Sequence, residues 1–156
     1  MAFGRSRFKP LFTRVDQDSF SVNLSDGQRD LIAGLIEQLD QMLDTQSPAL
    51  RRLFPEPYGD DAERNAGYAV LAGAELIESR HARVELMRSQ IRAEKLSAAD
   101  LDTWMRTLND LRLVIGTVLD ISDDGTEPGD DSELELFHVY EHLGFILEHV
   151  VEALME

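Results

Sequence analysis

An arginine inside an apolar helix face is the residue of this sequence best placed for unusual chemistry. Over Trp104 to Asp120, apolar residues recur at helical spacing, and Arg112 falls in the middle of their stripe, with Asn109 and Gly116 beside it. A buried guanidinium without a counter-ion costs several kcal/mol, so it must meet a carboxylate or reach water. We therefore expect Arg112 to form a buried clamp with an acid of a neighbouring element, with space for its stem left by Gly116. The candidate acids are Asp60, Asp61 and Glu78.

The same polar group has a functional alternative, in which it binds an anion or a partner protein. On this interpretation the binding cluster consists of Arg112, Asn109, Asp110, Asp60 and Asp61. A further alternative is a small-molecule or metal-binding enzyme with its site around Arg112 in the bundle. The residues alone leave the structural and the binding interpretations open.

Two Glu-x-x-His signatures, Glu78 to His81 and Glu135 to His138, point to a metal site. Ferritin-like bundles hold two metal ions with such a pair and one further glutamate from each of the other helices. The helix around Arg112 contains no glutamate, and Glu78, Glu135 and His138 project away from the apolar faces of their helices. Since a di-metal site must point inward, we expect none here.

His138 and His142 are four residues apart on one helix face, a spacing at which two imidazoles bind a divalent transition ion. The ligand set is incomplete and faces solvent, and the segment is not the His-Glu-x-x-His pattern of zinc proteases. We expect an exposed polar face and keep these two histidines as the alternative metal site. No cofactor is predicted.

Other catalytic signatures are missing from the sequence. It has no phosphate-binding glycine loop, no nucleophile elbow and no cysteine, so it offers no Cys–His arrangement and no disulfide framework. We expect a protein without enzymatic activity.

Helices must position these residues, and hydrophobic periodicity predicts them over most of the chain. Capping boxes at Ser25–Gln28 and Ser132–Glu135, and caps at Ser97 and at Asp60 or Asp61, indicate where helices begin. The predicted helices span residues 25–45, 61–95, 98–121 and 133–155, with a single helical turn around PALRRLF. Residues 1–24 are predicted to form a basic arm and a hairpin, and residues 122–132 a flexible acidic loop. The predicted fold is mainly α: a four-helix bundle with a small N-terminal β-hairpin, in a single helical domain over residues 1–156.

Charge is distributed unevenly along the chain, whose net charge is −15. The basic residues Arg5, Arg7, Lys9 and Arg14 precede any acid, and no lysine or arginine follows Arg112. Nucleic-acid backbones require clustered cations, so DNA or RNA binding would rest on this short arm alone. A transcriptional regulator is therefore the second alternative for function. The same polarity lets the arm of one subunit dock on the acidic C-terminal helix of another, which keeps a homodimer open.

Targeting and membrane signals are also absent from the sequence. No segment approaches the roughly 20 apolar residues that span a bilayer, and no long apolar run follows the N-terminal basic residues. We expect a cytoplasmic protein without membrane contact that acts as a non-catalytic protein-interaction or regulatory protein.

Three segments of the sequence carry a family resemblance: PALRRLFPEPYGDD from Pro48, WMRTLNDLRLVIGT from Trp104 and VYEHLGFILEHVVEAL from Val139. They resemble an actinobacterial family of domains of unknown function that is often encoded next to the Clp protease adaptor ClpS. The resemblance covers nearly the whole chain, and LNDLR is its most specific part. Members usually have another residue where this chain has the histidines of FHVYEH, which weakens the alternative metal site. The family has no established activity to carry over, and its gene neighbourhood implies a link to Clp-dependent proteolysis.

Overall fold

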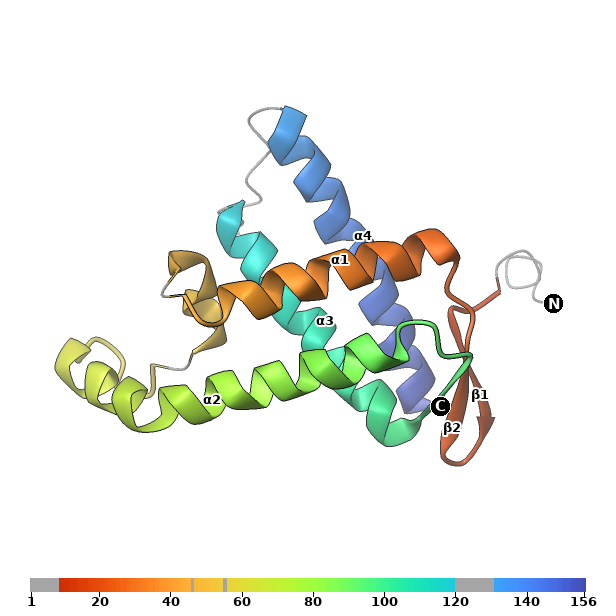
Figure 1. Cartoon of the computed structure of the whole chain (residues 1–156), viewed down its shortest axis with the longest axis horizontal. Helices are drawn as coiled ribbons and strands as arrows, with labels where there is room; N and C mark the ends of the chain where they lie inside the picture. Colours follow the sequence, from red (N-terminus) through yellow and green to blue (C-terminus); the bar gives the residue numbers. More distant parts are fainter. Residues whose placement is uncertain (1–8, 46, 55, 120–130) are drawn as a thin grey trace.

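The computed structural model describes residues 9–45, 47–54, 56–119 and 131–156. Four long helices and a small N-terminal antiparallel hairpin make up the fold, which confirms the predicted fold class (Figure 1). In chain order the elements are β1 (Phe12–Asp16), β2 (Ser19–Val22), α1 (Asp26–Met42), the 3-10 helix η1 (Pro48–Leu53), α2 (Ala62–Gln90), β3 (Lys95–Ser97), α3 (Ala98–Val118) and α4 (Asp131–Met155).

Side-chain caps set the starts of three helices where the sequence predicts them. Ser25 and Gln28 form the expected capping box of α1, Asp61 caps α2 and Ser97 caps α3. The predicted start of α4 is wrong, because the helix already begins at Asp131 and Ser132 lies inside it. Residues 122–130 of the predicted acidic loop, and Arg5 and Arg7, lie outside the described residues. The last two residues of that predicted loop, Asp131 and Ser132, lie in α4.

The hairpin has a third strand that the sequence analysis did not predict. β2 pairs antiparallel with β1 on one side and with β3 on the other, with Phe20 opposite Leu96. The expected continuation of α2 to residue 95 is wrong, because the helix ends at Gln90. Arg29 of α1, only 7% exposed, donates hydrogen bonds to the carbonyl oxygens of Ile91 and Ala93 at 2.9 and 2.8 Å. A cation at these carbonyls favours the end of the helix there.

Helix α3 lies at the centre of the structure and packs against α1, α2, α4 and η1. Ten of its residues are buried, whereas the longer α2 buries only Val84 and Met87. Trp104 in its first half is fully buried, and its indole N–H donates to the side-chain oxygen of Gln90 at 3.0 Å. None of the helices in the described ranges combines the length and the hydropathy of a transmembrane span.

Candidate interaction site

The first half of α2 extends beyond the other helices (Figure 1). The helix has 29 residues, which corresponds to about 43 Å at 1.5 Å per residue. From Ala62 to Glu75 none of its residues is buried, and we call this segment the outer half of α2. Val70 and Leu71 within it are 81% and 85% exposed. Large apolar side chains on a helix without tertiary cover are typical of an interaction surface.

A groove separates η1 from the outer half of α2. Its apolar part has a volume of about 290 Å³, and its lining residues include Leu50, Phe54, Ala69, Gly73 and Ile77. An adjoining hollow of about 520 Å³ is lined in part by Arg51, Asp60 and Asn65. The α2 side of the groove consists largely of small residues, which allow another helix to approach closely. The groove can therefore accept apolar side chains of a partner helix.

The η1 wall of this groove is tied to the helices by a buried carboxylate. Asp110 of α3 is 6% exposed, and its Oδ2 lies 2.7 Å from Nη2 of Arg83 and 3.4 Å from Nε of Arg80. Arg80 also donates a 2.8 Å hydrogen bond to the carbonyl oxygen of Leu53, and its guanidinium lies 5.7 Å from the ring centroid of Phe54. Asp110 therefore joins α3 to α2, and Arg80 joins both helices to η1.

Arg112 makes a different contact from the one that its position in the stripe predicts. Its guanidinium carbon lies 4.4 Å from the ring centroid of Tyr140, and within the described residues it has no carboxylate partner. The predicted clamp of Arg112 with Asp60, Asp61 or Glu78 is therefore wrong, and the cation is stabilised by an aromatic ring of α4 instead. Gly144, one helical turn after Tyr140, provides the space: a Cβ there would lie 3.2 Å from the guanidinium.

Gly116 has the reciprocal role on α3. A Cβ at this position would lie 3.3 Å from the ring of Tyr140 and 3.4 Å from Nη1 of Arg52. Each helix thus presents a large side chain and, four residues later, a glycine that receives the large side chain of the other helix. The space left by Gly116 is used by Tyr140 and Arg52, and not by the stem of Arg112.

The remaining residues of the predicted cluster are not brought together. Asn109 is exposed on α3, although Asp110 beside it is buried. Asp60 and Asp61 are exposed at the start of α2, where Asp61 accepts a hydrogen bond from the backbone N–H of Arg64 at 3.1 Å. This end of α2 is remote from α4 (Figure 1), so these two acids do not meet Arg112.

The histidines of α4 are distributed along its surface. His138 is 68% exposed and lies 3.6 Å from a carboxylate oxygen of Glu141, whereas His142 stacks on Phe145 with ring centroids 6.0 Å apart. In the described ranges, no three histidine, aspartate or glutamate side chains gather as metal ligands would. Glu78 and Glu135, the acids of the two Glu-x-x-His signatures, are both exposed.

The histidine of the first signature has a structural environment between α1 and α2. Nδ1 of His81 lies 2.5 Å from Oδ1 of Asp40, and Nε2 lies 2.9 Å from Oδ1 of Asp44. Hydrogen bonds to Asp40 and then to Asp44 raise the pKa of His81, because only the imidazolium can donate to both carboxylates. Burial works against the charged form of Asp40, but hydrogen bonds from His81 and Arg88 lower the pKa of this carboxyl below its usual value.

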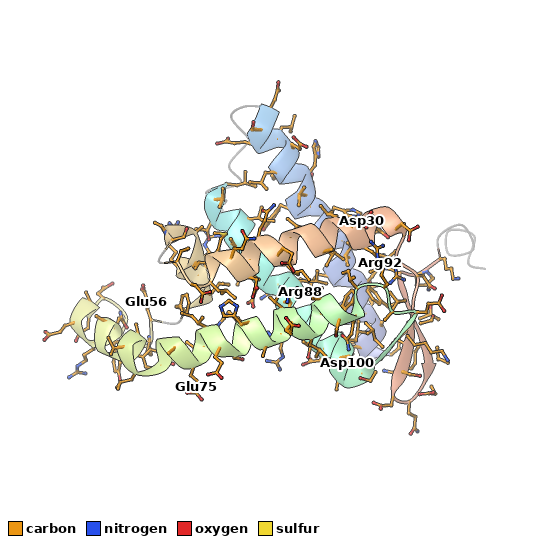
Figure 2. All side chains as sticks on the ribbon, viewed as in Figure 1. Asp30, Glu56, Glu75, Arg88, Arg92 and Asp100 are labelled. Carbon is orange, nitrogen blue, oxygen red and sulfur yellow. The ribbon has the colours of Figure 1, made fainter. Side chains whose placement is uncertain are left out.

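Two arginines continue this contact along α2. Arg88 pairs with Glu37 and Asp40 of α1, and Arg92 after the end of α2 pairs with Asp30. Figure 2 shows Arg88 on the side of α2 that faces α1. Ion pairs of Arg88 and Arg92 therefore join the C-terminal end of α2, and the residues after it, to α1.

Sequence reasoning missed a second buried face of α3, which includes Asp110. Thr107, Asp110, Val114 and Thr117 recur at helical spacing and are each at most 7% exposed. Both threonine hydroxyls donate to carbonyl oxygens four residues earlier, so they need no external partner. The i, i+3, i+7, i+10 spacing of these residues is visible in the sequence. A search for apolar residues at helical spacing does not find it, because all of them except Val114 are polar.

Sequence comparison relates this chain to proteins of actinobacteria. Residues 7–154 match the family model described as "Domain of unknown function (DUF2017)". The chain is 28% identical over 127 residues to "Oxidative stress regulator AosR" of Mycobacterium tuberculosis (strain ATCC 25618 / H37Rv), with 69% of this chain and 58% of that protein covered. It is 30% identical over 130 residues to "Putative oxidative stress regulator AosR" of Mycobacterium leprae (strain TN), with 70% and 59% covered. No solved structure gives a significant match.

These matches confirm the resemblance to an actinobacterial family of unknown function. The chain spans 58% of the length of the first of these curated relatives, so the activity of the whole relative is not transferred by the match.

Proposed function

This chain belongs to the DUF2017 family, and we propose that it is a regulatory protein that acts by binding another protein and not by catalysis. The partner site is the groove between η1 and the outer half of α2. The observation that carries the proposal is the exposure of this helix segment, in which no residue from Ala62 to Glu75 is buried. Val70, 81% exposed, lies about 60° around the helix from the groove residue Gly73, at about 100° per residue. A partner helix seated in the groove would cover it.

The relatives support a regulatory role, because the mycobacterial proteins are named oxidative stress regulators. The present sequence contains no cysteine, so it cannot respond to an oxidant through a thiol. We infer that its contribution to such a response is the binding of a partner. Cytoplasmic localisation and a link to Clp-dependent proteolysis remain predictions, the latter resting on the resemblance alone.

The other two functions considered have less support. An enzyme site around Arg112 would need its guanidinium to face a substrate, but the group is packed on Tyr140 and against Gly144. A DNA-binding regulator would need clustered cations, whereas the net charge of the chain is −15.

The experiment tests the groove by placing a photo-crosslinking amino acid at Val70 in the native host. We expect one adduct with a different protein, at a yield well above that of the same amino acid at Glu148. Glu148 is exposed on α4, away from the groove, and serves as the position control. Equal yields at Val70 and Glu148, or adducts only between copies of this chain, would contradict the proposal.

A groove-filling variant links the adduct to the groove itself. Gly73→Leu places a side chain in the groove, and a Cβ at Gly73 meets nothing within 4 Å, so the fold should persist. Gly34→Leu on α1 is the matched control, because Gly34 is also a helix glycine with nothing within 4 Å of an added Cβ. We expect loss of the Val70 adduct with Gly73→Leu and retention with Gly34→Leu. Retention with both would show that the partner does not use the groove.

A further inference from the structure

The outer half of α2 has a second exposed face, on the side opposite the groove. Arg64, Tyr68, Leu71 and Glu75 share this face, which we call the outer stripe, at spacings of four, three and four residues. Leu71 is 85% exposed and the Arg64 side chain 71% exposed. Glu75 points away from the rest of the molecule (Figure 2) and has no ion-pair partner in the described part of the chain.

The spacing of the outer stripe is that of the core positions of a coiled coil. Its two central members are an aromatic and an aliphatic residue, whereas its ends carry opposite charges. A 180° rotation that exchanges the two ends of the stripe places Arg64 at the former position of Glu75 and Glu75 at the former position of Arg64. A second copy of the chain, antiparallel to the first, therefore complements the stripe.

The register of this pairing follows from the sequence positions. If a two-fold axis passes between Ala69 and Val70, Tyr68 of each copy faces Leu71 of the other. The same register places Arg64 of each copy opposite Glu75 of the other, so two identical ion pairs flank the apolar centre. A parallel pairing would instead oppose arginine to arginine and glutamate to glutamate. Charge complementarity thus selects the antiparallel arrangement.

The shape of the face also fits a copy of itself. A depression of about 320 Å³ beside the outer stripe is lined by Tyr58, Arg64, Gly67, Tyr68 and Leu71. Gly67 has no side chain to fill this depression. In the antiparallel register described above, the protruding Leu71 of a second copy lies opposite Tyr68, which lines the depression. Each copy therefore carries both the protruding residue and the depression that receives it, as a two-fold symmetric interface requires.

Little intramolecular energy opposes the new ion pair. Arg64 contacts Asp61 of its own helix at 3.5 Å and lies over the ring of Tyr58 at 5.8 Å, both at an exposed site. Exposed pairs of this kind contribute little to stability, so Arg64 is available to turn toward Glu75 of a second copy.

We propose that two copies of this chain associate through the outer stripe, antiparallel, with Tyr68 and Leu71 at the centre and Arg64–Glu75 pairs at both ends. Three to four helical turns per copy bury less than the ~1,200 Å² of stable complexes, so the dimer is reversible and forms in the micromolar range. The surface lies opposite the groove, so this proposal is independent of the proposed function. Gly73→Leu, which fills the groove, leaves self-association unchanged.

Sedimentation velocity across the micromolar range tests the proposal on the full chain. The native chain shifts to dimer with concentration. Arg64→Glu and Glu75→Arg each weaken association at least ~10-fold, since both ends then oppose like charges. The double variant Arg64→Glu/Glu75→Arg regains association, and an equimolar mixture of the two single variants forms heterodimers.

Matched controls carry the same charge changes elsewhere on exposed helices. Arg106→Glu on α3 also breaks a surface pair within its own helix, with Asp102, and Glu152→Arg lies on the exposed side of α4. Both controls should associate as the native chain does. A native chain that stays monomeric, a double variant that fails to regain association, or controls that lose it equally would overturn the proposal.

Cysteine crosslinking reports the arrangement without relying on affinity, because the native sequence contains no cysteine. A chain with Leu71→Cys is mixed with a chain with Tyr68→Cys under mild oxidation. The antiparallel register gives mainly the mixed disulfide between the two variants. Mainly homodisulfides within each variant would indicate parallel pairing and would overturn the proposed register.

Discussion

Replacing Asp110 by asparagine removes the charge that holds α2 and η1 to α3 while keeping the size of the side chain. Its side chain is 9% exposed, and those of Arg80 and Arg83 are 14% and 21% exposed. Removing one partner of a buried ion pair costs about 3–5 kcal/mol, because the remaining charge is left uncompensated. Here two cations are left, but both retain some water and Arg80 keeps its bond to the Leu53 carbonyl. We therefore expect a loss at the lower end of this range, about 3 kcal/mol.

Urea unfolding followed by tryptophan fluorescence measures this loss. Trp104 is the sole tryptophan and is fully buried, so its emission reports the packing around α3. With a slope of about 2 kcal/mol per molar urea, a loss of this size lowers the unfolding midpoint by about 1.5 M.

Asp102→Asn is the matched control on the same helix. Asp102 lies 2.9 Å from Nε of Arg106, but their side chains are 42% and 62% exposed. A surface pair within one helix contributes about 0.3–0.5 kcal/mol, so the control should barely move the midpoint. Equal midpoints for Asp110→Asn and Asp102→Asn would show that water satisfies the two arginines and would refute the role assigned to Asp110.

Three further predictions concern the interior contacts between elements. The pKa of His81 is raised in the folded state, so its ion pairs add stability that is fully present below the ordinary histidine pKa of 6.5 and is lost as pH rises through the higher folded-state pKa. The difference in unfolding free energy between the native chain and His81→Asn should therefore shrink from pH 6 to pH 9. A constant difference would contradict the pairing. Gly34→Ala should raise stability by about 0.5–1 kcal/mol in thermal unfolding, because an added Cβ there meets nothing within 4 Å. Gly144→Ala should not show this gain, because its Cβ would lie 3.2 Å from the Arg112 guanidinium. Equal gains would be evidence against the close packing of Arg112 of α3 on Gly144 of α4. Arg29→Met should lower the free energy of urea unfolding by at least about 3 kcal/mol, since hydrogen bonds from a charged donor contribute about 1.5–3 kcal/mol each and four backbone carbonyls accept from this side chain. A loss below that of Arg106→Met would contradict this.

Helix positions could be predicted from local signals because a cap requires only a few adjacent residues. Ser25, Asp61 and Ser97 each accept a hydrogen bond from a backbone N–H three residues later in the chain. The end of α2 could not be predicted in this way. It depends on Arg29, about 60 residues earlier in sequence, whose guanidinium donates to the carbonyl oxygens of Ile91 and Ala93 just after the last residue of the helix.

The candidate site could be predicted only in outline. The LNDLR block was recognisable as unusual, and the structure places its Asp110 at the junction of three elements. The expected pairing of Arg112 with an acid failed because the search for a single apolar stripe assumes that a helix has only one buried side. Helix α3 is covered by η1 and α2 as well as by α4, so a polar face carrying Asp110 is buried too.

The amino-acid sequence is sufficient to predict the helical fold class, the starts of three helices, the absence of thiol chemistry and the strongly acidic character of the chain. These are local or additive properties, set by periodicity, caps and counts of residue types. The folded arrangement of the elements sets which charges are buried together, which glycines receive a side chain of another helix, and that the outer half of α2 remains uncovered. Those outcomes depend on where distant elements meet, because burial and electrostatic pairing are properties of neighbours in space and not of neighbours in sequence.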